Sequence, residues 1–284
     1  MLDTIFVERP FDFAKHSTIG CGGFARVGYY PKTEGEVKDL LSHLKNEVIV
    51  VGNLSNVLPL EGVTRKAVLC TKKLTKIRET EEGVFVSAGV TSAALLRYMQ
   101  ETGFSGAEFF AGIPCTFGGM LYMNGGAGGR YVSDIVKSVR IIRDGEFVDL
   151  PLEKCGYSYK NSVFMQTNDV ILGGVLHLEK RDKQTVEDEI HRWLKKRAHL
   201  PKGRSMGCVF KNPQGISAGS LIENAGLKGF RYGGAKVSEL HANFIINDQK
   251  ATAQEIRALI QIIKTAVYTQ YGVRLEEEIR YIKE

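Results

Sequence analysis

The sequence of 284 residues predicts an α+β fold with more than one domain. Short strand-like and helix-like segments follow one another without the regular βαβ alternation of a doubly wound sheet. The composition, with 43% hydrophobic and 25% charged residues, is ordinary for a globular protein. A chain of this length can also bury several hydrophobic cores, and it contains neither an internal repeat nor a low-complexity tract.

The first part of the chain predicts a helix among several strands. A helix is expected to begin after Thr33, because Glu36 follows three residues later in a capping-box arrangement. The β-branched run 47–51 predicts a strand that stops at Gly52. Further strands are expected at 66–70 and 84–88, and a helix is expected at 91–101, with Gly103 at its end.

The middle of the chain contains a strong hairpin signal. Asp144-Gly145 separates the strand-like segments 137–143 and 146–150. Another strand is expected at 170–178, followed by a helix at 186–196. The segment 200–207 is expected to be a loop that contains the last domain boundary.

The final part predicts a helix at 217–225, a strand at 243–246 and a long helix at 252–271. The long helix has a capping box formed by Thr252 and Glu255, and Gly272 follows its last turn. Its apolar stripe consists of Ile256, Leu259, Ile260, Ile263 and Val267.

The net charge of +6, from 38 basic and 32 acidic residues, is a mild excess that identifies no particular class of partner. It is too dilute to predict a nucleic-acid partner, although it is compatible with an anionic small substrate. The short basic runs 72–73 and 195–197 are expected to be solvated faces.

The five cysteines predict free thiols in a reducing compartment, because their number is odd and no C-x-x-C pair occurs. The chain lacks both a signal-peptide pattern and an apolar run of the about 20 residues that cross a bilayer. We therefore expect a soluble cytoplasmic protein without a membrane partner. No group of His, Cys, Asp or Glu has credible metal-ligand spacing, so we expect no catalytic metal.

Two glycine-rich segments stand out. The segment 51–57 follows a strand, and small residues there let backbone N–H groups converge on an anion. Taken alone it is better explained as a turn, since neither a G-x-G-x-x-G nor a Walker pattern is present. The segment 112–129 contains seven glycines, which core packing alone does not explain. Close approach of the backbone to a flat, phosphate-bearing ligand explains them better.

A series of motifs extends over nearly the whole chain. They are HSTIG at 16–20, VVGNLSNVL at 50–58, SGAEFFAGIP at 105–114 with GG at 118–119 and YMN at 122–124, GCVFKNP at 207–213, AGSLIE at 218–223, GLKG at 226–229, VSELHANF at 237–244 and LEEEIR at 275–280. With this ordered set the chain resembles the UDP-N-acetylenolpyruvoylglucosamine reductase (MurB) family. Its compact length is similar to that of the shorter branch of the family.

The resemblance implies a vanillyl-alcohol-oxidase-type (PCMH) FAD-binding fold in two subdomains and a C-terminal α+β substrate-binding domain. We expect the subdomains at 1–65 and 66–202 and the substrate-binding domain at 203–284. It also implies FAD-dependent reduction of UDP-N-acetylglucosamine enolpyruvate to UDP-N-acetylmuramate with NADPH, in peptidoglycan precursor synthesis.

Three residues are implied as catalytic. Reduction of the enol ether adds a hydride to one carbon and a proton to its neighbour, so the site needs an acid and donors for a developing oxyanion. Cys208 lies where the family usually has a serine acid, and a free thiol, with a pKa of about 8.5, is the better proton donor. Glu278 matches the family's catalytic glutamate, although such a residue is more often a solvated charge. Lys160 lies where the family typically has arginine, and an exposed loop lysine is the alternative.

The remaining site residues also follow from the resemblance. FAD is expected to be bound by Gly52, Asn53, Leu54, Ser55, Asn56, Val57, Gly112, Ile113, Pro114, Thr116, Gly119, Asn124, Gly126 and Arg280. The UDP-sugar is expected to be bound by Asn212, Lys228 and His241. Two alternatives stay open: another FAD-linked oxidoreductase of the same fold, and a non-catalytic UDP-sugar-binding relative. The oligomeric state is not determined by these patterns.

Overall fold

The computed structural model describes residues 5–45 and 47–283, which divide into two compact units that are each discontinuous in sequence. Unit 1 consists of Met1–Glu8, Val27–Asn53 and Ala67–Ala198, and unit 2 of Arg9–Arg26, Leu54–Lys66 and His199–Glu284. The chain therefore passes between the units several times. These compact units do not test the expected functional domains at 1–65, 66–202 and 203–284, which stay a prediction.

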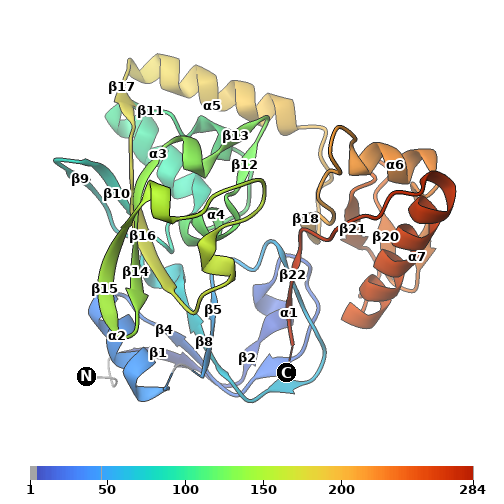
Figure 1. Cartoon of the computed structure of the whole chain (residues 1–284), viewed down its shortest axis with the longest axis horizontal. Helices are drawn as coiled ribbons and strands as arrows, with labels where there is room; N and C mark the ends of the chain where they lie inside the picture. The colour runs from blue at the N-terminus through green and yellow to red at the C-terminus, as the bar shows by residue number, and fades with distance from the viewer. Residues whose placement is uncertain (1–4, 46, 284) are drawn as a thin grey trace. The chain divides into compact units, whose positions relative to one another are not determined.

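The described residues of unit 1 form two larger sheets, four α-helices and several short 3-10 helices (Figure 1). The four-stranded sheet has the order β1 (Phe6–Glu8), β4 (Gly28–Tyr30), β8 (Ala67–Cys70), β5 (Val48–Val51). The five-stranded sheet has the order β15 (Glu146–Pro151), β14 (Val136–Arg143), β16 (Val170–Leu176), β10 (Gly83–Ser87), β9 (Ile77–Thr80). Two small pairs are β11 (Phe104–Ser105) with β17 (Glu179–Lys180) and β12 (Gly126–Ala127) with β13 (Arg130–Tyr131). The helices are α2 (Glu34–His43), α3 (Ser92–Thr102), α4 (Phe117–Met123) and α5 (Lys183–Arg197).

The local signals of unit 1 are confirmed by its elements. Thr33 caps α2 in a complete capping box with Glu36. The hairpin between β14 and β15 turns through Asp144 and Gly145, both of which have positive φ. Gly103 ends α3 in the left-handed conformation, which glycine adopts without a Cβ penalty. The five-stranded sheet is antiparallel throughout, whereas β8 pairs in parallel with both β4 and β5.

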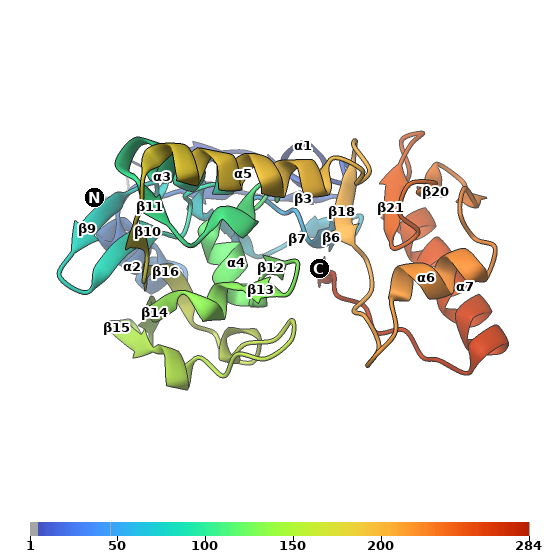
Figure 2. The same ribbon diagram turned by 90° about the horizontal axis from the view of Figure 1, so that it is seen from above.

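The main core of unit 1 lies between the five-stranded sheet and its helices. Apolar side chains from β10, α3, α4, β14 and α5 form one buried cluster. In this cluster α4 lies against β16, and α5 packs along α3, as both views show (Figures 1 and 2). A smaller cluster joins α2 to β8 and to the ends of β14 and β16.

The described residues of unit 2 form three small sheets and three α-helices. Its strands are β2 (Phe11–Asp12), β3 (Phe24–Ala25) and β7 (Val63–Thr64) in one sheet, β6 (Val57–Pro59) and β22 (Arg280–Ile282) in a second, and β18 (Ser205–Cys208), β21 (Phe244–Asn247), β20 (Ala235–Val237) and β19 (Arg231–Tyr232) in a third. The helices are α1 (Phe13–His16), α6 (Ala218–Asn224) and α7 (Ala253–Tyr271). The predicted apolar stripe of α7 is fully buried in the core of this unit.

One expectation from the sequence was wrong. The segment 200–207 was expected to be a loop, but Ser205–Cys208 forms β18, which pairs with β21. Gly207 has a φ of +75° and the register shifts between Ser205 and Cys208, so the strand is irregular and its sequence lacks the usual alternation. Burial of Met206 and pairing with β21 override that weak local preference.

Candidate functional site

The two glycine-rich segments meet in unit 1. Asn53 Nδ2, just after β5, donates a hydrogen bond of 2.8 Å to the carbonyl oxygen of Pro114. A Cβ atom on Gly52 would lie 2.2 Å from Thr116 Oγ1, so only glycine permits this close approach. The two segments are thus joined by the hydrogen bond between Asn53 and Pro114 and by the close approach of Thr116 to Gly52.

Thr116 is the most informative residue of this junction. It is 2% exposed, and its hydroxyl has no hydrogen-bond partner among residues 5–45 and 47–283. A buried hydroxyl in that condition costs roughly 1–3 kcal/mol, which an acceptor on a bound ligand would offset. A Cβ on Gly119 would meet only Thr116 Oγ1, at 3.7 Å, so the backbone there is open to a ligand. These residues fit a ligand that is rich in acceptor oxygens, as a dinucleotide is.

Other glycines of the second segment have structural explanations. A Cβ on Gly118 would lie 2.9 Å from the Ala88 Cβ, and one on Gly126 would lie 1.9 Å from the carbonyl oxygen of Arg130. These contacts let α4 approach β10 and let β12 pair with β13. Core packing therefore explains part of the segment, while Gly119 and Thr116 are the positions that point to a ligand.

Lys160 lies in a tight turn of unit 1. The backbone groups of Ser158 and Asn161 exchange two hydrogen bonds of 3.2 Å, and Lys160 between them has a φ of +52°. Asn124, which ends α4 in the left-handed conformation, donates to the carbonyl oxygen of Ser158 and accepts from the N–H of Ser133. Asn124 therefore holds the turn that carries Lys160, which is a structural role that the sequence did not reveal.

In unit 2 the main chain brings Cys208 and Glu278 close together. Cys208 is the last residue of β18, and the next residue, Val209, accepts a hydrogen bond of 2.8 Å from the N–H of Glu278. The pairing continues as Phe210 bridges Glu277 and as Lys211 N–H donates to the carbonyl oxygen of Glu276. Two candidate catalytic residues from distant parts of the sequence thus lie on neighbouring extended segments.

The direction of Glu278 follows from its neighbour. Glu277 accepts hydrogen bonds from Lys264 Nζ at 2.8 Å and from the Tyr281 hydroxyl at 2.5 Å, so it points toward α7. Burial opposes ionisation of Glu277, but these two hydrogen bonds outweigh it and hold its pKa below the ordinary value. Because successive side chains of an extended segment alternate, Glu278 points away from α7.

The loop after the first glycine-rich turn also reaches Glu278. Asn56 Nδ2 donates to the carbonyl oxygen of Glu278 at 3.1 Å, and the N–H of Arg280 donates to the carbonyl oxygen of Asn56 at 2.9 Å. Arg280 then pairs with Val57 as β22 joins β6 in parallel. Within unit 2 the structure therefore groups Asn56, Val57, Glu278 and Arg280, which the sequence assigned to cofactor binding and catalysis.

The three candidate substrate residues lie around α6. Asn212 Oδ1 accepts from the N–H of Ala218 at the start of the helix, and Lys228 Nζ pairs with Glu223 at 2.6 Å. His241 lies against Gly219, where an added Cβ would meet its ring at 3.1 Å. Its Nδ1 accepts from the N–H of Asn243, and burial lowers its pKa, so the neutral imidazole is favoured.

Asn243 is a residue that sequence analysis did not select. It is 3% exposed, and its side-chain amide contacts both backbone groups of Phe210. The sequence offered one signal for Asn243, its position directly before β21 and two residues after His241. This position does not reveal that the side chain pairs with the backbone of Phe210.

Cys208 is also distinct among the cysteines. All five are free thiols, and Cys208 is partly exposed whereas the other four are buried. Burial raises the pKa of Cys21 and Cys115 to about 12 and that of Cys155 to about 11.

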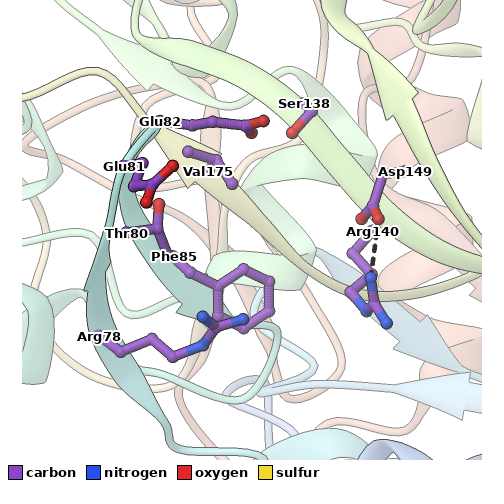
Figure 3. A pocket seen from close by; sticks show the side chains of 9 residues that line it. All are labelled: Arg78, Thr80, Glu81, Glu82, Phe85, Ser138, Arg140, Asp149 and Val175. Atoms are coloured by element: carbon purple, nitrogen blue, oxygen red, sulfur yellow. Dashed lines mark hydrogen bonds and ion pairs between the residues drawn. The ribbon is translucent and has the colours of Figure 1, made fainter.

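A cavity of about 390 Å³ in unit 1 does not coincide with these residues (Figure 3). It is lined by Arg78, Thr80, Glu81, Glu82, Phe85, Ser138, Arg140, Asp149 and Val175, and none of these was selected from the sequence. The Arg78 guanidinium stacks over the Phe85 ring, and Arg140 pairs with Glu34 and Asp149. Among the charged side chains that line the cavity, Arg140 and Asp149 form an ion pair with each other.

The described residues contain neither a metal-ion cluster nor a membrane-spanning helix. No group of three or more His, Cys, Asp or Glu side chains is arranged to hold a metal ion in the described part of the chain. No described helix is both long enough and apolar enough to span a bilayer.

Comparison with known proteins gives consistent matches across the chain. Residues 198–282 match the C-terminal domain of UDP-N-acetylenolpyruvoylglucosamine reductase, and residues 25–150 match an FAD binding domain. A UDP-N-acetylenolpyruvoylglucosamine reductase of Chlamydia abortus is 35% identical over 97% of this chain and 94% of the relative. One of Geobacter metallireducens is 36% identical over 98% of this chain and 94% of the relative. The crystal structure of the reductase from Thermus caldophilus superimposes with a TM-score of 0.85 and 30% identity, over 98% of this chain and 100% of that one.

Proposed function

The chain belongs to the UDP-N-acetylenolpyruvoylglucosamine reductase family, and from this premise we propose which residues perform the reaction. The protein is a flavoprotein oxidoreductase that reduces UDP-N-acetylglucosamine enolpyruvate to UDP-N-acetylmuramate with NADPH, in peptidoglycan precursor synthesis. The predicted fold class, cofactor and activity are thereby confirmed. The residue roles below are our proposals.

FAD, when bound, supplies the hydride chemistry. In unit 1 we propose that it is bound by Gly52, Asn53, Gly112, Ile113, Pro114, Thr116, Gly119, Asn124 and Gly126. The hydrogen bond between Asn53 and Pro114 and the buried hydroxyl of Thr116 support this set. Leu54, Ser55, Asn56, Val57 and Arg280 are the remaining proposed FAD-binding residues, and the pairing of Val57 with Arg280 supports their grouping.

Cys208 is the proposed acid. The observation that supports this role best is that the one partly exposed cysteine ends an irregular strand and lies beside the segment of Glu278. Its Sγ–H donates a proton to the substrate carbon next to the one that receives hydride, because a protonated thiol is a better donor than an alcohol. Glu278 is the second catalytic group.

Lys160 is proposed to stabilise the negative charge that develops on the substrate carboxylate and enolate. Its left-handed backbone conformation supports a functional role, because lysine is disfavoured there. Asn212, Lys228 and His241 around α6 are the proposed substrate-binding residues. Lys228 is proposed to neutralise the charge of the diphosphate. The five free thiols support a reducing, cytoplasmic location.

The test separates the two half-reactions by following flavin absorbance in a stopped-flow instrument. Cys208→Ala should leave reduction by NADPH unchanged and slow reoxidation by the enolpyruvyl sugar by roughly 10²–10⁴-fold, the usual contribution of a general acid. Cys208→Ser, which introduces the residue usual in the family, is the matched control and should retain reoxidation. If both half-reactions slow equally in the Ala variant, Cys208 is not the acid.

A non-catalytic binder is distinguished by colour. The purified protein should be yellow and should bleach when NADPH is added. A colourless protein that still binds the UDP-sugar would contradict the enzymatic assignment.

A further inference from the structure

We propose that Asn243 is a positioning residue for Cys208, acting through the main chain of Phe210. This inference rests on the proposed role of Cys208 as the acid. Asn243 has no place among the candidate catalytic or ligand-binding groups, and its side-chain amide contacts the backbone of Phe210.

The side-chain amide of Asn243 pairs with the backbone of Phe210 as a neighbouring strand would. Its Nδ2 donates to the carbonyl oxygen of Phe210 at 2.8 Å, and its Oδ1 accepts from the N–H of Phe210 at 2.9 Å. Its own carbonyl oxygen accepts from the N–H of Val209 at 2.8 Å. Three hydrogen bonds from one residue therefore hold the two residues that follow Cys208.

The need for this support comes from the irregularity before Cys208. The ladder between β18 and β21 shifts register between Ser205 and Cys208, and Gly207 has a positive φ. Cys208 pairs with Phe244, but the regular pairing of the residues just before it is interrupted. On the C-terminal side the segment lies between Asn243 and the backbone of 276–278, which pairs with Val209 and Lys211. Phe210 is buried, so its backbone groups need these partners.

Proton transfer is sensitive to such positioning, since a displacement of about 1 Å can change a rate by roughly 10²-fold. Asn243→Asp keeps the shape of the side chain but replaces the NH₂ donor by a carboxylate oxygen that faces the Phe210 carbonyl. When that carboxyl group is protonated, it again offers one donor and one acceptor. Burial raises the pKa of a carboxyl group, so we expect this protonation at a pH above the ordinary aspartate range.

The experiment measures both half-reactions of the FAD-loaded Asn243→Asp protein from mildly acidic to mildly alkaline pH. Reduction by NADPH should match the wild type at every pH. Reoxidation by the enolpyruvyl sugar should be slowed on the order of 10- to 100-fold at alkaline pH and should recover as pH falls. Resistance to urea should follow the same curve, because a raised folded pKa adds stability that is lost as pH rises through it.

Two further variants keep the test decisive. Asn243→Ser removes the paired hydrogen bonds without adding a charge, and it should show the same selective loss without recovery at low pH. Asn247→Asp is the matched control, because Asn247 is also buried but contacts Ile19 and Ala251 rather than the Cys208 segment. It should lose stability and keep both half-reactions.

The proposal is wrong if reoxidation in Asn243→Asp is unaffected, if its loss does not depend on pH, or if Asn247→Asp has the same kinetic effect. Cys208→Ala in the same assay separates the two levels of inference. Normal reoxidation in Cys208→Ala would refute the acid assignment itself. Slow reoxidation in Cys208→Ala with normal reoxidation in Asn243→Asp would refute only the positioning role.

Discussion

Lys160 adopts a left-handed φ of +52°, which disfavours any residue with a Cβ by about 1–2 kcal/mol. Thr116 and Tyr157 each bury a hydroxyl oxygen that has no hydrogen-bond partner in the described part of the chain. Asn243, by contrast, uses its full amide for the backbone of Phe210. Single residues therefore differ in whether their backbone conformation and their buried polar groups are favourable. A strained backbone or an unpaired buried hydroxyl at the proposed site makes its residue a candidate for function.

A first prediction concerns Lys160. Lys160→Met should lower turnover because it removes the positive charge, whereas Lys160→Arg should retain it because the charge is kept. Steady-state kinetics with the enolpyruvyl sugar measures both. Neither variant relieves the left-handed conformation, so their unfolding midpoints should be similar. A fully active Met variant would remove Lys160 from the site.

A second prediction concerns Tyr157, whose pKa is raised by burial and by Cys155. Tyr157→Phe removes an unpaired buried hydroxyl, so the free energy of unfolding should be unchanged or higher by up to about 1 kcal/mol. Tyr281→Phe is the control, because its hydroxyl donates to Glu277, and that variant should lose about 1 kcal/mol. Urea unfolding measures both. Equal destabilisation of the two variants would show that the Tyr157 hydroxyl has a partner.

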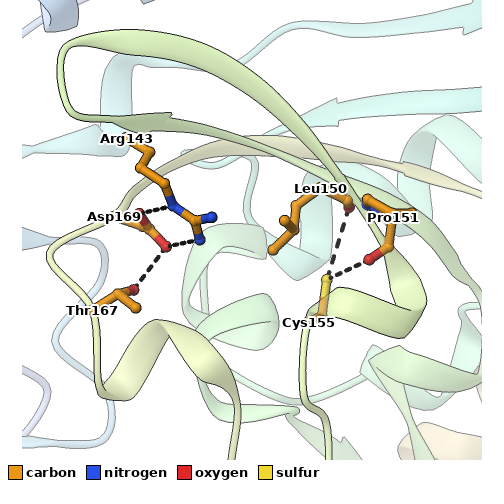
Figure 4. Close-up of polar contacts among 6 residues, drawn as sticks. All are labelled: Arg143, Leu150, Pro151, Cys155, Thr167 and Asp169. Carbon is orange, nitrogen blue, oxygen red and sulfur yellow. Dashed lines mark hydrogen bonds and ion pairs between the residues drawn. The ribbon is translucent and has the colours of Figure 1, made fainter.

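At the scale of elements, polar clamps between neighbouring segments hold the irregular parts of the fold. Arg143 at the end of β14 makes two hydrogen bonds, of 2.9 and 2.7 Å, to Asp169, and Thr167 donates to the same carboxylate (Figure 4). Cys155 Sγ donates to the carbonyl oxygens of Leu150 and Pro151, the last two residues of β15 (Figure 4). The loops that enter and leave the five-stranded sheet are thus tied to its strands.

The clamp around Asp169 predicts a dependence of stability on pH. The hydrogen bonds from Arg143 lower the pKa of Asp169 below its ordinary value and outweigh burial. The clamp therefore contributes stability above the pKa of unfolded aspartate, and this contribution is lost as pH falls through the lower folded pKa. Asp169→Asn should cost about 1–2 kcal/mol at neutral pH, a value reduced because Arg143 is partly exposed.

Urea unfolding of the wild type and Asp169→Asn at several pH values measures this effect. The difference in free energy of unfolding should shrink in the acid range, where both proteins lack the charge. A difference that stays constant down to the lowest pH at which both proteins fold would contradict the assignment.

At the scale of the whole molecule, each unit is assembled from segments that are distant in sequence. The segments 9–26, 54–66 and 199–284 form one core in unit 2, and β22 near the end of the chain pairs with β6. The candidate residues follow the same division, with Lys160 in unit 1 and Cys208 and Glu278 in unit 2. The pairing partners within unit 2 therefore come from different parts of the chain.

The sequence by itself determined the elements that have local signals and the family. The capping boxes of α2 and α7 and the Asp144-Gly145 hairpin were predictable because each depends on residues within a few positions of one another. Only the tertiary structure decided that Ser205–Cys208 is a strand, that Asn53 meets Pro114, that Glu277 contacts α7 and that Asn243 holds Phe210. These features depend on partners far away in the chain, whose positions are set by long-range packing rather than by local backbone preference.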